Sequence, residues 1–400
     1  MKMKRIILFI LCMTLGISSS VAQSKVPEVR ELAGIRHPLH RTEIVLPQVN
    51  GYNIYKADLH VHTIFSDGHV TPAERVREAW LDGLDILAIT EHLEYRPWEN
   101  HFLKFTKNYN ANKKPHKGVN TNVIVEPADK TGILADLNLS VELAKKEMSR
   151  YDNMLLIPGI EITRHATDIG HYCALFTKDN NTIYDPDPLK SLRKARAQGA
   201  LITHNHPGYK RTTCDITEFE QKAYDAGLID GIEVANAFSF YPPTVRRAIE
   251  RNFYMVAATD THHPTMDELR GLGVYRTMTF ILAKENTAEA IREALEARRT
   301  LGYCAGHIIG TKELLGALFT ASTRSKFLSK DSQGNCTYMV TNLSSIRYTL
   351  HLGGTTYHLH PFGTVTIRFI AKGGVSSEPV LRIGNMWCED NKNITIRLQD

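Results

Sequence analysis

Apolar runs alternate with amphipathic stretches between residues 51 and 305, and this pattern predicts strands alternating with helices. The predicted strands are residues 56–62, 85–90, 154–163, 171–177, 200–203, 230–236 and 254–259. The predicted helices are residues 72–82, 137–150, 188–198, 218–226, 243–251 and 288–298, several of which begin at or near a proline. Such alternation predicts an α/β protein with a parallel sheet or barrel. The link at 164–170 is too short for a helix, so we expect an irregularity there.

The pattern changes after about residue 310 to short alternating stretches separated by Gly and Asn turns. Residues 310–400 are therefore predicted to form a small all-β, sandwich-like domain. Its predicted strands are residues 337–341, 347–352, 355–360, 365–370, 380–383 and 394–398. Residues 23–50 predict an extended lead-in, and the Asn- and Lys-rich residues 97–135 predict a long loop.

The first 22 residues have the order of a secretory signal peptide. Lys2, Lys4 and Arg5 make a basic start, residues 6–17 are apolar, and small residues precede a cleavage point after Ala22. The apolar stretch is shorter than the about 20 residues that a membrane span needs. We expect a periplasmic or secreted chain without a transmembrane segment after cleavage; a buried N-terminal helix is the alternative.

Charge and cysteine content narrow the class of protein. The net charge of +5 is spread along the chain, without a Lys/Arg block that alternates with aromatic residues, so nucleic-acid binding is not indicated. Five of the six cysteines follow the signal stretch, and no C-x-x-C occurs, which argues against a disulfide scaffold or a structural zinc site. Cys336 and Cys388 could pair in an oxidising compartment or remain free thiols. The oligomeric state is not indicated.

Residues 58–68 read Asp-Leu-His-Val-His-Thr-Ile-Phe-Ser-Asp-Gly and carry a candidate metal site. His60 and His62 are two residues apart, and residues so spaced in a strand point to one face. Asp67 follows in a turn with Gly68 and can fold back toward them. Imidazole nitrogens beside a carboxylate suit zinc, iron or manganese. An ordinary histidine pair is the alternative.

Charged residues also end or interrupt the next predicted strands. Glu91 and His92 end one strand and point in different directions, so at most one is expected to be a ligand. Glu161 lies inside an apolar run, where a carboxylate is costly unless it is paired or metal-bound, and it is the candidate for a bridge between two metals. His171 opens the following strand, and His165, in the loop between, is a weaker candidate.

Two further pairs follow apolar runs at a spacing of two, His204 with His206 and Asp260 with His262. Five strand ends thus offer His, Asp or Glu. In (β/α) barrels the C-terminal ends of several strands together build the active site. Ordinary strand ends would explain each segment alone, but the set predicts one metal site.

At these residues the chain resembles the PHP family, named for polymerase and histidinol phosphatase domains. The motifs run from Asp58 to His262 and read, in order, D-L-H-V-H-T…S-D-G, I-T-E-H, G-I-E-I-T, G-H-Y-C-A-L-F, N-H-P-G and T-D-T-H. The resemblance implies a distorted seven-stranded (β/α) barrel, similar to a TIM barrel, over residues 51–309. It also implies two or three divalent metal ions, with zinc, manganese or iron as candidates.

The resemblance further implies which residues hold each metal. It assigns His60, His62, Glu161 and Asp260 to one metal, Glu161, His171 and His206 to a second, and Asp67, His92 and His262 to a third. His204 is off the family pattern and is a less certain ligand. More narrowly, residues 94–97, residues 161–164 and the trailing β-segment are similar to the exported, Sb-PDE-like phosphodiesterases of this family.

The implied activity is hydrolysis of a small-molecule phosphoester, most simply a phosphodiester. A hydroxide held between metals beside Glu161 would attack phosphorus, and the metals with a nearby cation would stabilise the charge. Arg96 and Arg164 are the expected cations, followed by Lys210, because a guanidinium matches phosphate well. Ordinary surface arginines are the alternative. The leaving oxygen would be protonated through His262, His204 or the third metal.

Other functions stay open. One is a phosphomonoesterase similar to histidinol phosphatases, and the sequence does not separate it from a diesterase. Another is a non-enzymatic metal- or glycan-binding protein, although the C-terminal segment shows no obvious aromatic platform and bracing is its expected role. An amidohydrolase-like enzyme is disfavoured because no strand run carries a lysine that could be carboxylated.

Overall fold

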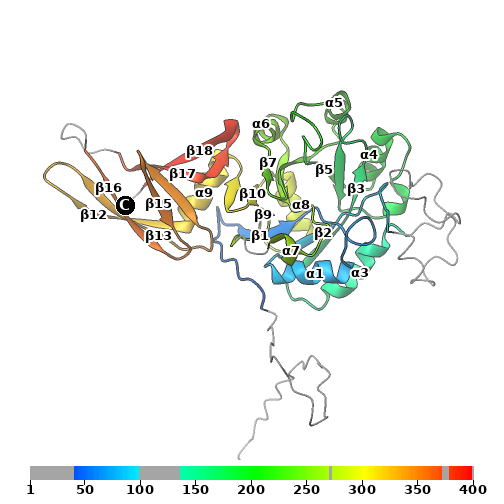
Figure 1. The fold of residues 1–400 in the computed structure, drawn as a ribbon, viewed down its shortest axis with the longest axis horizontal. Coiled ribbons are helices and arrows are strands. Elements are labelled where there is room, and N and C mark those ends of the chain that lie inside the picture. The colour runs from blue at the N-terminus through cyan, green and yellow to red at the C-terminus, as the bar shows by residue number, and fades with distance from the viewer. Residues whose placement is uncertain (1–39, 99–135, 270–272, 372–377, 399–400) are drawn as a thin grey trace, which may run out of the picture. The chain divides into compact units, whose positions relative to one another are not determined.

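Strand pairing arranges the chain into one large and one small sheet (Figure 1). The computed structural model describes residues 40–98, 136–269, 273–371 and 378–398. The predicted signal peptide at 1–22, most of the lead-in at 23–50 and nearly all of the loop at 97–135 lie outside the described residues. Residues Arg41–Asp400 form one unit.

The structure contains the following elements. The strands up to residue 309 are β1 (Asn53–Asp58), β2 (Ile86–Ile89), β3 (Leu155–Thr163), β4 (His171–Leu175), β5 (Leu201–Asn205), β6 (Gly231–Asn236), β7 (Ser239–Phe240), β8 (Tyr254–Ala258), β9 (Met278–Ala283), β10 (Thr300–Cys304) and β11 (His307–Ile309). The later strands are β12 (Thr323–Lys330), β13 (Cys336–Asn342), β14 (Tyr348–Leu352), β15 (Thr355–Leu359), β16 (Thr364–Phe369), β17 (Val380–Cys388) and β18 (Lys392–Arg397). The helices are α1 (Pro72–Leu81), α3 (Leu139–Met148), α4 (Pro188–Ala197), α5 (Glu218–Asp225), α6 (Pro242–Arg251), α7 (Thr265–Leu269), α8 (Ala288–Glu296) and α9 (Lys312–Ser322), with short 3-10 turns at Asn180–Thr182 and Glu389–Asn391.

Seven strands of the large sheet follow the order β1-β2-β3-β4-β5-β6-β8. β1, β2 and β3 are mutually parallel, as are β5, β6 and β8. Beyond the ends of β8 and β1, an isolated parallel bridge joins Val61 to Thr261. The mixed α/β class is confirmed, while a closed seven-stranded barrel stays a prediction.

β4 runs opposite to both of its neighbours. Antiparallel neighbours can be joined by a short connection, which explains why no helix lies in the link at 164–170. Thr163 at the end of β3 pairs with His171 at the start of β4. The beginning of β4 therefore lies at the same edge of the sheet as the C-terminal ends of β3 and β5.

Helix starts and strand burial follow from the local sequence. Thr71 and Asp187 cap α1 and α4 with their side chains, and a proline follows each cap, in the position where its missing N–H is harmless. All residues of β2, β4, β5, β6 and β8 are buried, as expected for strands covered on both faces. Within the described residues no helix is long and apolar enough to span a bilayer.

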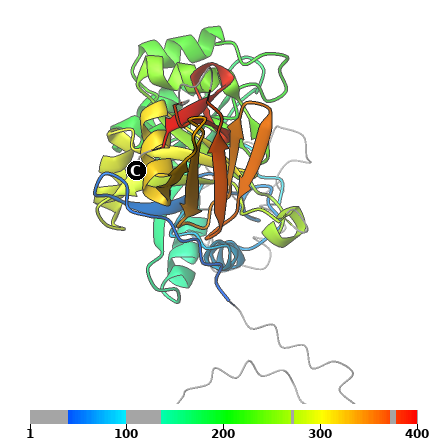
Figure 2. The ribbon, with the colours of Figure 1, turned by 90° about the vertical axis from the view of Figure 1, so that its left-hand side faces the viewer.

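The C-terminal segment is divided between the two sheets. β12, β13 and β16 form the small antiparallel sheet, while β14, β15, β17 and β18 join the large sheet through the parallel pair β11–β17 (Figure 2). Val340 of the small sheet, Leu350 and Ile383 of the large sheet and Phe319 of α9 belong to one apolar cluster. The expected β-rich segment is present but opens with the helix α9, and a separate sandwich domain stays a prediction. Cys336 and Cys388 carry free thiols.

A buried ion pair with Arg276 and a hydrogen bond from Thr259 hold Asp58 at the end of β1. Arg276 is fully buried and its guanidinium lies 2.6 Å from Asp58 of β1 and 3.0 Å from Asp82. The Thr259 hydroxyl, next to β8, donates a 2.5 Å hydrogen bond to Asp58. Asp58, the first residue of the D-x-H-x-H motif, is thus a structural anchor beside the predicted ligands.

We predict that Arg276→Met lowers the free energy of unfolding by about 3–5 kcal/mol, because it leaves a buried carboxylate without its counter-charge. Urea denaturation followed by circular dichroism measures the change. The matched control is Arg368→Met, which breaks an exposed pair with Asp331 and should cost less than about 1 kcal/mol. Equal losses in the two variants would contradict the prediction.

Candidate metal centre

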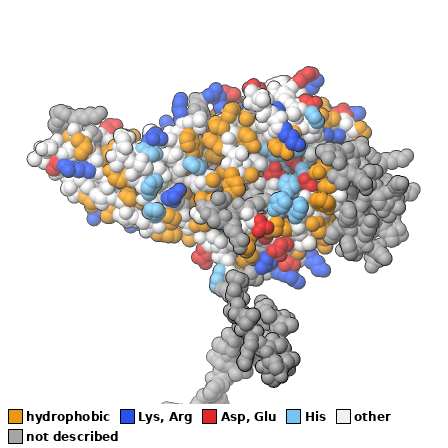
Figure 3. All heavy atoms as spheres, in the orientation of Figure 1, with side chains coloured by type: hydrophobic (Ala, Val, Ile, Leu, Met, Phe, Trp, Pro, Cys, Tyr) orange, Lys and Arg blue, Asp and Glu red, His pale blue; other side chains and the backbone are white. Residues whose placement is uncertain are grey.

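Nine imidazole and carboxylate side chains lie together at one edge of the large sheet, and Figure 3 shows histidine and acidic side chains gathered at one place on the visible face. They form overlapping groups in which one ligand atom per residue lies within 4.8 Å of the others. The groups are His62, Asp67, His92 and His262; His60, His62 and Glu161; His60, His206 and Asp260; and Glu161, His171 and His206. All nine were predicted ligands, and His204 belongs to none of the groups.

The strand directions explain how residues distant in sequence meet. His60 and His62 follow the regular part of β1 rather than lying inside it, as the sequence had suggested, and His92 follows β2. Glu161 lies within β3, and His206 directly follows β5. His171 is different, because it begins its strand, and the reversal of β4 brings it to the edge where the other strands end.

The carboxylate of Glu161 occupies the middle of the cluster and is fully buried. Its Oε1 lies 3.2, 3.4 and 3.5 Å from ring nitrogens of His60, His171 and His206. Its Oε2 lies 2.5 Å from His92 Nδ1 and 3.8 Å from His62 Nε2. The two oxygens therefore face two different sets of imidazoles, which is the arrangement that a carboxylate between two metals requires.

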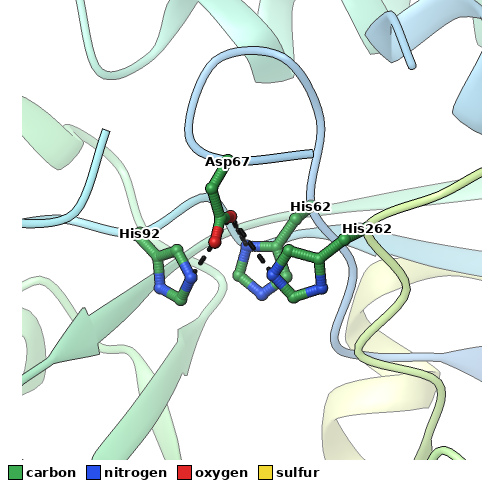
Figure 4. Close-up of side chains that lie close together, drawn as sticks. All are labelled: His62, Asp67, His92 and His262. Carbon is green, nitrogen blue, oxygen red and sulfur yellow. Dashed lines mark ion pairs between the residues drawn. The ribbon is translucent and has the colours of Figure 1, made fainter. Parts of the chain in front are cut away.

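Asp67 organises the outer group (Figure 4). Its Oδ1 lies 3.2 Å from His262 Nε2, 3.3 Å from His92 Nε2 and 3.9 Å from His62 Nδ1. The ring of His62 stacks between those of His92 and His262, with centroids 4.2 and 4.3 Å away. One carboxylate thus faces three imidazoles that come from three separate segments of the chain.

Asp260 faces the inner histidines. Its Oδ1 lies 3.0 Å from His62 Nε2 and 3.2 Å from His60 Nε2. Asp260 and His206 both have positive φ angles, of 54° and 25°. Non-glycine residues in this region are strained, and such strain concentrates at functional sites.

Backbone carbonyls select which ring nitrogen His171 and His262 turn inward. His171 Nε2 lies 3.0 Å from the Arg164 carbonyl, so it carries the proton, and Nδ1 faces Glu161 as a lone pair. This Nδ1 is buried and forms no hydrogen bond within the described part of the chain. His262 Nδ1 likewise donates to the Asp260 carbonyl at 2.7 Å, which leaves Nε2 toward Asp67. Lone pairs that converge in this way fit a bound divalent cation, and the mixture of nitrogen and oxygen donors suits zinc, manganese or iron.

The electrostatics of the cluster couple metal uptake to proton release. Burial raises the pKa of Glu161, but the imidazoles of His60, His92 and His171 lower it by more, so the pKa lies well below its ordinary value. Burial lowers the pKa of His62 to about 3, with His92 and His262 acting in the same direction. Burial also lowers the pKa of His92, but Glu161 and Asp67 raise it by more, so this pKa lies well above its ordinary value. A cation bound among these carboxylates competes with that proton.

Comparisons with known proteins identify the family of the chain. A family model for the PHP domain matches residues 58–230. The crystal structure of a two-domain protein from Bacteroides vulgatus superimposes with a TM-score of 0.73 at 30% identity, covering 90% of this chain and 98% of that one. It is described as containing a predicted PHP-like metal-dependent phosphoesterase. The chain belongs to the PHP family. Its assignment as an enzyme is thereby confirmed, and the non-enzymatic alternative is set aside.

Two more distant proteins were also found. An uncharacterized protein of Methanocaldococcus jannaschii is 26% identical over 164 residues, which are 38% of this chain and 58% of that protein. This chain therefore matches less than two thirds of the relative's length. A lesion-specific endonuclease from Pyrococcus furiosus is 15% identical with a TM-score of 0.38, covering 65% of this chain and 59% of that one. Neither likeness carries information on the substrate of this PHP protein.

A carboxylate that the sequence analysis missed supports the ligands of this PHP site. Glu233 of β6 is fully buried, and its Oε1 lies 2.8 Å from His60 Nδ1. Its Oε2 accepts hydrogen bonds from the His206 backbone at 2.6 Å and from Asn236 at 2.9 Å. A carboxylate behind a ligating histidine fixes the ring and raises its basicity. The sequence signal that could have revealed Glu233 is the one used for Glu161, a glutamate inside an apolar run.

Glu91 has a similar supporting role on the other side of the site. Its carboxylate accepts hydrogen bonds from the hydroxyls of Thr63 and Ser66, both at 2.5 Å, and from the Thr63 backbone. These bonds hold the turn that carries Asp67. Of the neighbouring pair, His92 belongs to a metal group and Glu91 belongs to none of those found among the described residues.

A cavity of about 870 Å³ opens beside the metal groups, and the predicted cations differ in their relation to it. Arg164 lines the cavity, but its Nε lies 2.9 Å from Glu94 and a terminal nitrogen donates to the Asp185 carbonyl at 2.6 Å. Arg96 is buried and is not among the lining residues. Lys210 lines the cavity and has no ion-pair partner in the described residues. The first-choice cations are thus less suitable for substrate binding than the third.

His204 and His165 lie apart from the metal groups. His204 Nδ1 lies 2.6 Å from the Tyr224 hydroxyl and its Nε2 lies 3.3 Å from Glu220, so its ring belongs to a separate buried network. His165 is exposed, pairs with Asp168 and lines the cavity, but it belongs to none of the metal groups.

We predict that Glu161→Gln lowers the metal content of the purified protein by at least one equivalent, because Gln offers neither the charge nor the second anionic oxygen. Inductively coupled plasma mass spectrometry after dialysis measures the content. The control is Glu220→Gln, an equally buried carboxylate outside the metal groups, which should retain the full content. An unchanged content in Glu161→Gln would show that this carboxylate is not a ligand.

We also predict that Glu233→Ala weakens metal binding by about 10–100-fold, the usual effect of removing a carboxylate behind a ligating histidine. Titration against a chromophoric chelator gives the dissociation constant. Glu233→Gln keeps an acceptor for His60 and should lie between the wild type and Glu233→Ala. An affinity within twofold of the wild type in both variants would exclude this supporting role.

Proposed function

We propose that this PHP enzyme hydrolyses a small-molecule phosphodiester with the help of two or three divalent metal ions. The observation that carries the proposal is the position of Glu161, whose two carboxylate oxygens face separate sets of imidazoles beside an open cavity. The description of the related Bacteroides vulgatus protein as containing a metal-dependent phosphoesterase supports the phosphoester class.

His60, His62, Asp260 and Glu161 would hold one ion, Glu161, His171 and His206 a second, and Asp67, His92 and His262 a third. Such ions supply Lewis acidity and an activated water nucleophile at neutral pH. The chain contributes the orientation of its ligands through Glu233, the Arg164 carbonyl and the Asp260 carbonyl.

His262 would serve as a ligand of the third ion and not as the acid for the leaving oxygen, because its Nε2 faces Asp67 and its Nδ1 donates to the Asp260 carbonyl. It lines the cavity and is partly exposed. His204 had been an alternative, but it is fully buried, does not line the cavity and is bonded to Tyr224 and Glu220. Of the three groups considered, this leaves the third ion, which Asp67, His92 and His262 would hold and which would supply the acidity needed at the leaving oxygen.

The size and lining of the cavity favour a diester over a monoester. Tyr95, Tyr184 and Tyr209 line it together with polar groups. A volume of about 870 Å³ lies within the range of pockets that take drug-sized ligands. It leaves room for substituents on both sides of a phosphoryl group. A phosphomonoesterase with one large substituent is the second candidate.

Export and the narrower subtype belong to the same proposal. The basic, apolar and small-residue order of residues 1–22 supports a periplasmic or secreted enzyme. Glu94, Tyr95 and Arg164, from the two segments that resemble the Sb-PDE-like phosphodiesterases, line the cavity. Cell fractionation with an antibody to the mature chain tests the location, and recovery in the cytoplasm alone would overturn it.

We predict that metal-loaded protein hydrolyses bis(4-nitrophenyl) phosphate faster than 4-nitrophenyl phosphate, and that Glu161→Gln lowers kcat/KM for the diester at least about a hundredfold, comparable with the loss of one electrostatic stabiliser of the transition state. Release of 4-nitrophenol is followed by absorbance. The control is Glu218→Gln, an exposed glutamate paired with Lys222, which should retain full activity.

Each other outcome changes the proposal in a defined way. Faster monoester turnover that also requires Glu161 would make the enzyme a phosphatase. Cleavage of single- or double-stranded oligonucleotides in parallel assays would replace the small-molecule substrate by nucleic acid. Metal-loaded protein without activity on any of these substrates would overturn the assignment.

A further inference from the structure

The segment from His206 to Cys214 is a strained turn at the cavity. The φ angles are positive at His206 (25°), Gly208 (120°) and Lys210 (57°). A Cβ at Gly208 would lie 2.9 Å from Cys214 Sγ, so the turn closes on itself at a residue without a side chain. Non-glycine residues persist in such conformations only where the surroundings hold them. The turn therefore needs an anchor outside itself.

A buried polar network supplies that anchor. Arg211, directly after Lys210, lies 3.0 Å from Glu220 Oε1, and the same carboxylate lies 3.3 Å from His204 Nε2. His204 and Glu220 are fully buried, and the side chain of Arg211 is nearly so. The other oxygen of Glu220 accepts the Thr217 N–H at 2.9 Å, which caps the start of α5. One carboxylate thus connects the turn to α5 and to the buried end of β5.

Besides the candidate ligand His206, the turn presents two side chains to the cavity, Tyr209 and Lys210. The ring centroid of Tyr209 lies 5.1 Å from that of the candidate ligand His206 and 6.1 Å from that of His171, and 46% of the residue is exposed. Lys210 Nζ lies 5.1 Å above the Tyr209 ring. This places an ammonium group at the cavity that the metal groups also line, on a tyrosine face that favours a nearby cation.

The other cationic groups at the cavity already have partners. Arg164 is bonded to Glu94, the Asp185 carbonyl and Ser191, and His165 is paired with Asp168. Among the described residues Lys210 has no such partner. Its ammonium group therefore remains available for an anion that enters the cavity.

We propose that Lys210 binds the phosphoryl oxygens of the substrate, and that Arg211, Glu220 and His204 are positioning residues that act through it by holding the turn. This inference rests on the proposed function, because it assumes that a phosphoryl group is what enters the cavity. It gives a role to His204, which the metal groups leave without one.

The test is calorimetric titration of the metal-loaded protein with inorganic phosphate, which needs no turnover. Lys210→Met keeps the length of the side chain and the same backbone constraint, and it should raise the Kd for phosphate about tenfold, the effect of losing one hydrogen bond to a charged group. Lys210→Arg should restore most of the affinity. Lys178→Met removes an exposed lysine that does not line the cavity and should leave the Kd unchanged.

A double-mutant cycle tests the positioning role. Arg211→Met should raise the Kd for phosphate with the metal content unchanged, and Arg211→Lys should recover part of the affinity. In the Lys210→Met background, Arg211→Met should have no further effect, because it acts only through Lys210. Should Arg211→Met fail to fold, Glu220→Gln, which keeps the shape of the side chain, takes its place in the cycle.

Three results would overturn the inference. The first is a Kd for phosphate that Lys210→Met leaves within twofold of the wild type. The second is additive effects of the changes at 210 and 211, which would make Arg211 independent of Lys210. The third is the absence of phosphate binding by the metal-loaded wild type. Phosphate binding that depends on Lys210, in a protein that cleaves no ester, would instead retain the inference and reject the proposed hydrolysis.

Discussion

The buried carboxylate of Glu161 is the constraint on which the rest of the site depends. Burying a carboxylate away from solvent costs free energy unless positive charge or hydrogen bonds compensate for it, and Glu161 has both kinds of partner. Asn205 donates to one oxygen at 2.8 Å and Thr163 to the other at 3.1 Å, in addition to the imidazoles on each side. The backbone of Glu161 is held as well, since its N–H donates to the Glu91 carbonyl and its carbonyl accepts a hydrogen bond from Leu93 N. The segment after β2, which carries His92, is thereby aligned with β3.

Much of the fold could be predicted from the sequence because local patterns determine it. The seven predicted strands and the helices before residue 300 are present with ends shifted by a few residues, since apolar periodicity and proline-marked helix starts are local signals. β9, β10 and β11 were missed. They pair antiparallel on the far side of β1, and a search for strands that alternate with helices does not reveal such an edge. The helix α9 was missed because the segment was assigned from the β-pattern that follows it.

The candidate site was predictable where residue type alone decides the chemistry. Closely spaced histidines and carboxylates at strand ends indicated a metal site, but the choice of the nine candidate ligands among them came from the resemblance to the PHP family. Cations are different, because an arginine serves equally well as a substrate group or as the partner of a carboxylate. Arg164 contacts Glu94, 70 residues before it, and no sequence pattern reveals that contact. Glu233 was overlooked although its sequence context matched that of Glu161, because no motif drew attention to it.

The parallel pair β11–β17 has a consequence for how the chain acquires its fold during synthesis. β11 ends at Ile309, and its partner β17 begins only at Val380. Until that later segment has left the ribosome, the hydrogen-bonding groups on one side of β11 have no partner strand. Unpaired sheet edges invite association with other chains. Polypeptides that end between these two strands would therefore expose an unpaired strand edge with which other chains could pair. In the complete fold, β17 covers that edge.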